Sequence, residues 1–175
     1  MLARSGINGA EIIAASGTYK LELPADTWVD LDAAADAIHR AETAQARGQL
    51  DEACGWALAA RAIGSRPLLP GIDGAWLERE RARLGETLLR ALACLGEVWI
   101  ASGDPELAAR DAETAIRLDP YREVSHRLLI RARLAAGDRG AARRAFEACR
   151  QVFRDDLGVE PSAETAALVP SLDPW

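Results

Sequence analysis

The feature that most constrains this chain is a sequence pattern that recurs after 34 residues. Gly103-Asp104 is followed at this offset by Gly137-Asp138, and a helical pattern follows each pair. Mostly small residues stand at matching offsets after each start, namely Ala108, Ala112 and Ala115 in the first copy, Ala142, Phe146 and Cys149 in the second, and Ala53, Ala57 and Ala60 in a third copy that starts at Gly48. Because small side chains let helix backbones approach closely, the pattern predicts helical hairpins that stack and bury these faces against one another.

The stretch "LACLGEVW" gives the best copy a recognisable first helix, and Pro120 stands where its second helix should end. The residues that carry the pattern in this stretch are Leu92, Leu95, Gly96 and Trp99. They resemble the tetratricopeptide repeat, with Leu92 in place of its opening aromatic residue. The resemblance covers, in decreasing completeness, residues 89–122, 123–156 and 31–65. It implies an all-α protein in which antiparallel helix pairs form a tetratricopeptide-like right-handed superhelix.

The spacing of apolar residues places the individual elements. It predicts helices over 26–48, 49–64, 75–102, 104–118, 121–136 and 138–157, and a short one after Pro161. Residues 10–23 instead alternate apolar and polar and break at Ser16-Gly17, which predicts a small N-terminal β-hairpin. A lone hairpin is marginally stable in water, so it either docks on the helices or is the remainder of another domain.

Composition fits a helical protein that works in the cytoplasm. Hydrophobic residues make up 49% of the chain, but alanine supplies much of this share and aromatic residues only 5%. The three cysteines are scattered, which favours small buried hydrophobic residues in a reducing compartment. The chain has no apolar run of the roughly 20 residues that a membrane span needs, and its N-terminus lacks an apolar signal-peptide stretch.

Charge is distributed unevenly along the chain. The net charge is −6, yet residues 121–154 hold nine arginines against three carboxylates, a local balance of +6. Two interpretations stay open at this point. Either opposite charges meet within the fold or between copies, or the basic end meets an acidic partner or a phosphate backbone.

The sequence shows no sign of catalysis. The two histidines, His39 and His126, share no metal-ligand spacing with each other or with a cysteine. We expect His39 to be semi-exposed and structural, and His126 to take the bulky packing position of a repeat hairpin. There is no G-x-S-x-G turn and no phosphate-binding glycine loop that ends in G-K-S/T. We therefore expect no enzyme, no metal and no cofactor.

What remains is a binding surface. In repeats of this kind the first helix of each hairpin lines the concave side, and the 34-residue register predicts which residues face it. The candidate groove contacts are Arg90, Glu97, Ile100, Arg127, Arg131 and Leu134. Arginines around apolar residues suit an acidic, hydrophobic peptide or a helix of a neighbouring domain. Alternatively, the C-terminal stretch "ALVPSLDPW" folds back and fills the groove. Among the tryptophans, we expect Trp28, Trp56, Trp76 and Trp99 to be mostly core and Trp175 to be exposed.

Several stretches match more than a generic repeat. "RPLLPGIDGAWLERERARL", the segment from "LDPYREVSHR" to "ACRQVF", and "DDLGVEPSAET" together resemble the bacterial transcriptional activator domain of actinobacterial antibiotic-pathway regulators. The most specific pieces are Trp76 with Glu80-Arg81, Asp119-Pro120 with Arg122-Glu123, and 157–162. The resemblance covers roughly residues 27–168.

In that family the helical module follows a winged helix-turn-helix domain. The resemblance implies that "EIIAASGTYKLEL" is the last hairpin of such a wing, with Gly17, Tyr19 and Leu21 in its closing pattern. Only ten residues precede it, and none resembles a recognition helix. We therefore expect residues 1–24 to be the remnant of a winged helix domain and 25–175 to be the activator module. The chain would be a truncated or naturally shortened relative that does not read DNA by itself.

The function that this resemblance implies is a protein–protein interaction and oligomerisation module of a transcriptional activator. Its expected partners are a second copy in a dimer, RNA polymerase or another regulatory protein, with DNA reached only through the winged domain. Two alternatives stay open. One is a free-standing tetratricopeptide-like adaptor that binds a peptide in its concave groove. The other is a shortened protein that pairs with full-length relatives and blocks them.

Overall fold

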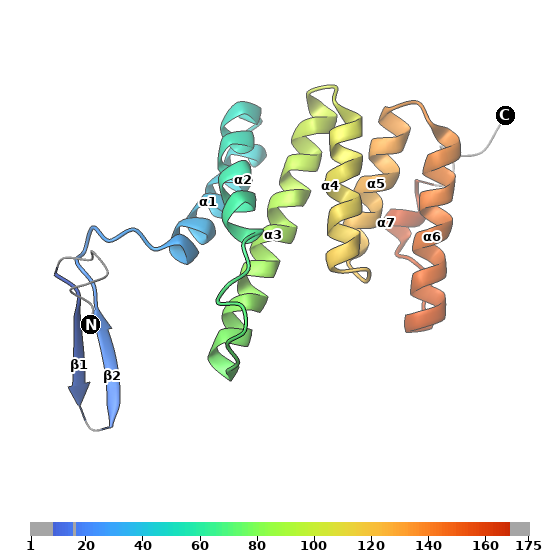
Figure 1. Ribbon diagram of the computed structural model, residues 1–175. Coiled ribbons are helices and arrows are strands. Elements are labelled where there is room, and N and C mark those ends of the chain that lie inside the picture. The colour runs from blue at the N-terminus through green and yellow to red at the C-terminus, as the bar shows by residue number, and fades with distance from the viewer. Residues whose placement is uncertain (1–8, 16, 169–175) are drawn as a thin grey trace. The chain divides into compact units, whose positions relative to one another are not determined.

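The computed structural model describes residues 9–15 and 17–168 and divides the chain into two compact units, Met1–Asp30 and Leu31–Trp175. The first unit holds an antiparallel hairpin of β1 (Glu11–Ala15) and β2 (Thr18–Glu22). The second unit is helical (Figure 1). The prediction of an all-α protein with a small N-terminal β-hairpin is confirmed.

Seven helices run through the described residues, and each corresponds to a predicted one. They are α1 (Asp30–Ala46), α2 (Leu50–Gly64), α3 (Ala75–Ala101), α4 (Pro105–Leu118), α5 (Glu123–Ala135), α6 (Arg139–Leu157) and α7 (Ala163–Ala166). The first six form three successive hairpins, and α7 follows as a single turn. The first helix starts later than the apolar spacing predicts, because the chain turns between Pro24 and Thr27, whose backbone N–H bonds to the Pro24 carbonyl.

The three hairpin turns have the same geometry, which shows that the repeat is real in all three copies. Gly48, Gly103 and Gly137 have φ values of +73°, +84° and +77°, a left-handed conformation that suits glycine. In each turn the next residue donates its N–H to the carbonyl five positions earlier: Gln49 to Ala44, Asp104 to Trp99 and Asp138 to Arg133. This is the Schellman closure of a helix end. The sequence therefore repeats a turn as well as a helix face.

Small residues form the seams between helices, as the pattern predicts. The side chains that are fully buried at the repeat positions are those of Ala53, Ala57, Ala60, Ala108, Ala112, Ala142 and Cys149. Gly96 takes this close approach furthest, because a Cβ added there would lie only 2.3 Å from Cδ2 of Leu128 on α5. Alanine and glycine thus set how closely the helices stack.

The cysteines behave as small hydrophobic residues. Cys94 and Cys149 are buried, and Cys54 is half-buried; none of the three forms a disulfide. Burial raises the pKa of the Cys94 and Cys149 thiols to about 11 in each case. Both thiols therefore stay protonated at neutral pH and are poor nucleophiles.

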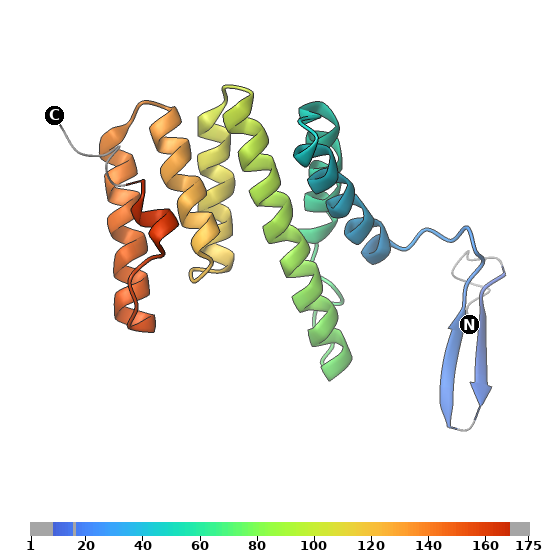
Figure 2. The same cartoon turned by 180° about the vertical axis from the view of Figure 1, so that it is seen from behind.

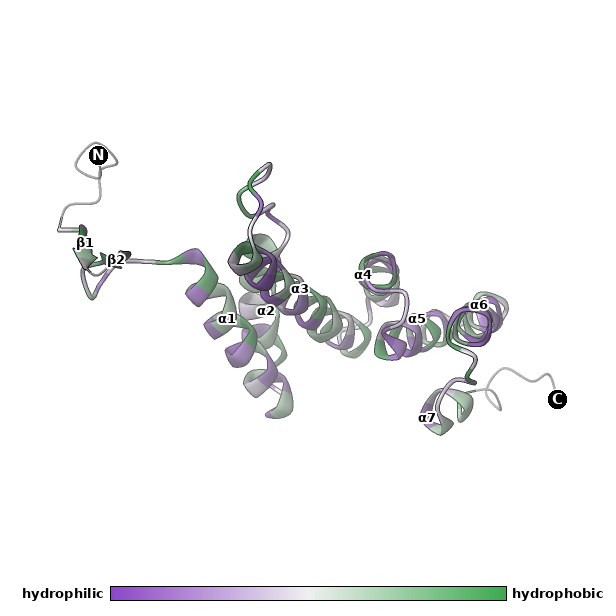
Figure 3. Ribbon diagram, turned by 90° about the horizontal axis from the view of Figure 1, so that it is seen from below, coloured by the Kyte–Doolittle hydropathy of each residue, from purple (hydrophilic) through white to green (hydrophobic). Residues whose placement is uncertain are grey.

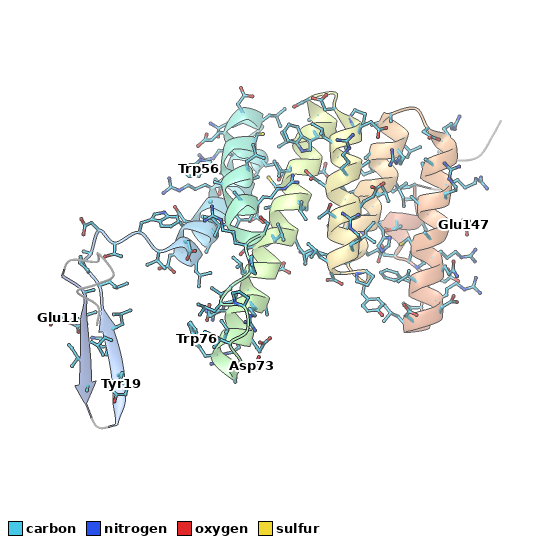
Figure 4. All side chains as sticks on the ribbon, viewed as in Figure 1. Glu11, Tyr19, Trp56, Asp73, Trp76 and Glu147 are labelled. Atoms are coloured by element: carbon cyan, nitrogen blue, oxygen red, sulfur yellow. The ribbon has the colours of Figure 1, made fainter. Side chains whose placement is uncertain are left out.

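The tryptophan prediction is wrong for two of the four residues expected in the core. Trp28 is 68% exposed and precedes α1, and Trp76 is 57% exposed in the first turn of α3. Trp56 and Trp99 pack partly buried against the core between α1, α2 and α3. Figure 4 shows Trp76 at the far end of α3, beyond the region where the helix packs on its neighbours. Trp175 lies outside the described residues.

The β-hairpin has one apolar face. In its register Ile12 pairs with Leu21 and Ala14 with Tyr19, so these four side chains share a face. Ile12, Tyr19 and Leu21 are all exposed. An amphipathic two-stranded sheet of this kind normally gains stability by packing its apolar face on other structure.

Candidate interaction surface

The six predicted groove residues lie on the first helices of two neighbouring hairpins. Arg90, Glu97 and Ile100 belong to α3, whereas Arg127, Arg131 and Leu134 belong to α5. We call the side formed by α1, α3 and α5 the first-helix face. Figure 2 views the chain from behind, with α1 and α7 in front.

Arginine–glutamate pairs join the first helices of successive hairpins. Arg131 of α5 makes a two-pronged pair with Glu97 of α3, with Nη2 2.9 Å from Oε2. Arg90 of α3 makes a second one with Glu42 of α1, with Nε 2.7 Å from Oε1. A third two-pronged pair joins the start of α5 to α3. We call the three pairs the inter-hairpin ladder: Glu42–Arg90, Glu97–Arg131 and Glu86–Arg122.

The ladder engages most of the charge predicted for the groove. The hydrogen bond between Arg90 and Glu42 raises the pKa of Arg90, and the hydrogen bond between Arg122 and Glu86 raises the pKa of Arg122. Exposed pairs of this kind contribute at most about 1 kcal/mol each, so their main effect is on orientation between hairpins. Sequence reasoning found Glu97 and Arg131, which stand one repeat apart, but missed Glu42 and Glu86. The sequence signal for such a pair is the 34-residue offset, and neither Glu42 nor Glu86 stands at that offset from its arginine partner.

The two apolar candidates are part of the packing between helices. Ile100 packs against the buried cluster of Ala108, Ala109 and Ala132. Leu134 packs against Ile130 and Ala142, together with Leu168 from the C-terminal segment. Both side chains are half-buried, so they offer only part of their surface to a partner.

Arg127, the last candidate, is covered by the chain's own C-terminal segment. Its Nη2 lies 3.1 Å from Glu164 of α7, and its Nη1 lies 3.7 Å from Glu123 of α5. In Figure 3, α7 lies beyond α5 and α6, on the side away from α4. The segment that covers Arg127 precedes the stretch "ALVPSLDPW", of which only Ala167 and Leu168 are described. The alternative in which that stretch fills the groove therefore stays a prediction, because residues 169–175 lie outside the described residues.

Glu123 is the anchor that holds α7. It accepts hydrogen bonds from the Ser162 N–H at 2.8 Å, from the Ser162 hydroxyl at 2.6 Å and from the Thr165 hydroxyl. Burial raises the pKa of Glu123, but these hydrogen bonds and the nearby Arg127 outweigh it and leave the pKa below its usual value. The ionised carboxylate therefore favours the docked segment. This contribution is present above the usual carboxyl pKa and is lost as the pH falls through the lowered one.

We expect Glu123→Gln to loosen α7 while the three hairpins stay folded. The amide keeps the size of the side chain but loses the charge that strengthens its hydrogen bonds, at a cost of about 1 kcal/mol. Hydrogen exchange should then speed up at the amides of Thr165 and Leu168. Glu164→Gln is the matched control, because Glu164 also pairs with Arg127 but its side chain is largely exposed. Equal protection in both variants would contradict the anchoring role.

A second exposed surface lies at the start of α3, next to the residues 65–74 that the apolar spacing left between two predicted helices. The guanidinium of Arg81 donates to three loop carbonyls, those of Leu68 at 3.1 Å, Leu69 at 2.7 Å and Ile72 at 3.0 Å. The loop it holds presents Leu69 and Ile72, which are exposed, as is Trp76 in the first turn of the helix that follows. We call Leu69, Ile72 and Trp76 the α3 tip. An apolar group held in place by its own loop is typical of a contact surface.

A buried carboxylate links three helices in the stack. Asp111 of α4 is 4% exposed and accepts hydrogen bonds from Arg61 of α2 at 2.8 Å and from the indole of Trp99 at 3.0 Å. Burial raises the pKa of Asp111, and the two partners offset this only in part. The network joins α2, α3 and α4, and we call it the clamp.

The two histidines lie in different surroundings. His126 is buried, as predicted, and its Nε2 donates to the Pro120 carbonyl at 2.8 Å while its ring meets Phe153 edge-on. His39 is exposed on α1. Within residues 9–15 and 17–168, no three histidine, cysteine or acidic side chains come together as metal ligands. Over the same residues, no helix is long and apolar enough to cross a membrane.

Comparison with known proteins identifies a family. The model of the bacterial transcriptional activator domain matches residues 29–172. The regulatory protein AfsR of Streptomyces coelicolor is 27% identical over 158 residues. A solved structure of Mycobacterium tuberculosis EmbR in complex with a low-affinity phosphopeptide superimposes with a TM-score of 0.78 and 26% identity over 92% of this chain.

The likeness is confined to part of each regulator. The chain spans 16% of the length of AfsR and 42% of the EmbR chain. The C-terminal tetratricopeptide domain of a putative Plasmodium falciparum FK506-binding protein also matches, with a TM-score of 0.60 and 14% identity over 83% of this chain and 93% of that one. That match confirms the tetratricopeptide-like fold.

Proposed function

The chain belongs to the bacterial transcriptional activator domain family, and we propose from this that it is a non-enzymatic protein–protein interaction module that helps a transcriptional activator to self-associate in the cytoplasm. The observation that carries the proposal is the family match over residues 29–172, nearly the whole helical stack. The β-hairpin before it fits the end of the winged helix domain that precedes this module. DNA contact would then belong to that winged domain and not to the helices.

The α3 tip is the surface that supports self-association best. Its three apolar side chains are exposed, and Arg81 holds their loop in one conformation. A preorganised apolar surface loses little conformational entropy on binding, and exposed tryptophan is enriched at the energetic centre of interfaces. Two copies that meet through this surface would bring two winged domains to neighbouring DNA sites.

Protein partners other than a second copy find support in the relatives. EmbR has been solved with a phosphopeptide, although this chain spans less than half of that protein. On the present chain, the first-helix face would supply the contacts through Arg90, Glu97 and Arg131, whose ladder pairs remain partly exposed. RNA polymerase is one such partner in the proposal.

Sedimentation velocity of the whole chain over a range of concentrations tests the proposal. We expect a monomer–dimer equilibrium, and we expect Trp76→Ser to raise the dimer dissociation constant by about tenfold or more, as for a central interface tryptophan. Trp28→Ser is the matched control, because Trp28 is even more exposed than Trp76 but lies outside the helical unit. A monomer at the highest concentration would contradict self-association.

The alternative, a free-standing adaptor, is supported by the partly exposed charge of the first-helix face. Arg131→Gln separates the two functions, since it removes one ladder charge without adding a second carboxylate beside Glu97. Weaker peptide binding by a chain that remains monomeric would favour the adaptor.

A further inference from the structure

The junction between α2 and α4 and the junction between α4 and α6 differ at equivalent positions. Between α2 and α4, Arg61 and Asp111 meet in the buried clamp. An offset of 55 residues, from Gly48 to Gly103, carries Arg61 onto Ile116, and the 34-residue offset carries Asp111 onto Ala145. The second junction therefore has a branched apolar residue and a small one where the first has an ion pair.

An apolar groove of about 270 Å³ lies at the second junction. Both α4 and α6 pack on α5, which lies between them (Figure 1). The groove is lined by Glu113, Ile116 and Arg117 of α4, His126 and Leu129 of α5, and Ala145 and Ala148 of α6. Its volume suits one large apolar side chain, and the alanines of α6 leave that space open.

Two of the residues that line the groove, Glu113 and Arg117, carry charge. Glu113 is already engaged by Arg133, whose Nη2 lies 2.8 Å from its Oε1 and which also pairs with Glu106. Arg117 donates only to the Thr114 hydroxyl, at 2.8 Å, and has no carboxylate within ion-pair distance among the described residues. Arg144, one position before Ala145, is exposed on α6. A ligand at this groove would therefore meet an apolar floor beside the guanidinium of Arg117, which is free to take a carboxylate.

We propose that the α4–α6 groove binds an acidic amphipathic segment of another protein, with one large apolar side chain on Ile116 and Leu129 and a carboxylate on Arg117. An apolar anchor flanked by acidic residues matches both the floor and the rim, which is the logic of a helix docked in a groove. A nucleic acid would use the arginines but would gain nothing from the apolar floor. The inference does not depend on the proposed self-association, because the groove lies away from the α3 tip.

The probe is a labelled helical peptide in which leucine and phenylalanine recur every three to four residues and glutamate fills the other positions. A second peptide with lysine in place of every glutamate is the probe control. We expect the acidic peptide to bind the whole chain with micromolar affinity, more weakly as salt is added, and the lysine peptide not to bind.

Two variants assign the binding to the groove. Arg117→Glu should weaken binding by about tenfold, because an attractive charge becomes a repulsive one. Arg79→Glu is its control, since Arg79 is an exposed arginine at the start of α3 and away from the groove. The double variant Ile116→Arg with Ala145→Asp should abolish binding, because it recreates the ion pair of the first junction and fills the groove.

Several outcomes would overturn the proposal. These are equal binding of the acidic and lysine peptides, no binding of either, and unchanged binding in Arg117→Glu. A DNA duplex that binds in an Arg117-dependent manner would make the surface a phosphate site instead. A dimer that Arg117→Glu dissociates would make it a contact between copies. Absence of peptide binding at the groove would not change the effect of Trp76→Ser on self-association, so each proposal can be contradicted without the other.

Discussion

Adding a methyl group at two glycines of the same helix is expected to change stability in opposite directions. Gly85→Ala should stabilise the chain by about 0.5–1 kcal/mol, because glycine is a poor helix former and an added Cβ meets nothing within 4 Å. Gly96→Ala should destabilise it by about 1–3 kcal/mol, since its Cβ would lie 2.3 Å from Cδ2, 2.9 Å from Cδ1 and 3.0 Å from Cγ of Leu128. Chemical denaturation of both variants measures the difference.

The clash at Gly96 is costly because Leu128 is itself buried and cannot simply swing away. Leu128→Ala alone should cost about 2–5 kcal/mol through the cavity it leaves. In the double variant Gly96→Ala with Leu128→Ala, the new methyl group occupies part of that cavity. The double variant should therefore be clearly more stable than the sum of the two single effects predicts. Additive effects would show that α3 and α5 do not meet at this point.

The stack of hairpins was predictable because its determinants are local and repeated. Each copy has a glycine where the turn requires a left-handed conformation and an alanine where the helices pack, as at Gly48 and Ala53 or Gly103 and Ala108. Even the least complete copy has both residues, although its first helix lacks the glycine and the aromatic residue of the repeat. Seams and turns therefore follow from sequence alone.

The exposure of Trp76 was not predictable from spacing. An apolar residue in helical register is buried only where other structure covers its side of the helix. In the first turn of α3, Leu77 is buried whereas its neighbour Trp76 is exposed. The side that is covered, and not the spacing alone, decides whether such a residue is core or contact surface.

Charged partners were the least predictable part of the site. Long arginine side chains reach many carboxylates, and the choice depends on how the hairpins stack. The excess of arginine in 121–154 is largely met by glutamates of other elements, as with Arg122 and Glu86 or Arg133 and Glu106. Most of the local charge imbalance is thus resolved inside the fold.

Removing the carboxylate of Asp111 is expected to destabilise the chain by about 2–3 kcal/mol in Asp111→Ala. The partly buried indole of Trp99 would lose the acceptor of its N–H at a cost of about 1–3 kcal/mol, and a small cavity would add to it. Arg61 contributes less, because its side chain is 41% exposed and can turn to water. Glu97→Ala is the control: it breaks an ion pair of similar geometry, but an exposed one, and should cost less than about 1 kcal/mol.

The raised pKa of Asp111 predicts the direction in which the stability of the folded chain changes with pH. Because the folded state binds the proton more tightly than the unfolded state, ionisation of Asp111 costs stability, and this cost appears as the pH rises through the raised pKa. The wild type should therefore lose stability relative to Asp111→Asn as the pH rises from acid toward neutral. If the wild type instead gained stability relative to Asp111→Asn over this pH range, stabilisation of the carboxylate by Arg61 and Trp99 would outweigh the cost of its burial.

The same reasoning predicts that an apolar clamp is tolerated. Replacing Arg61 and Asp111 by leucine and Trp99 by phenylalanine removes all three polar partners at once, so that no buried donor or charge is left without its counterpart. This triple variant should recover most of the stability lost in Asp111→Ala, as thermal denaturation would show. If it does not, the ion pair itself, and not the avoidance of an orphaned Trp99 N–H, stabilises the α2–α4 junction.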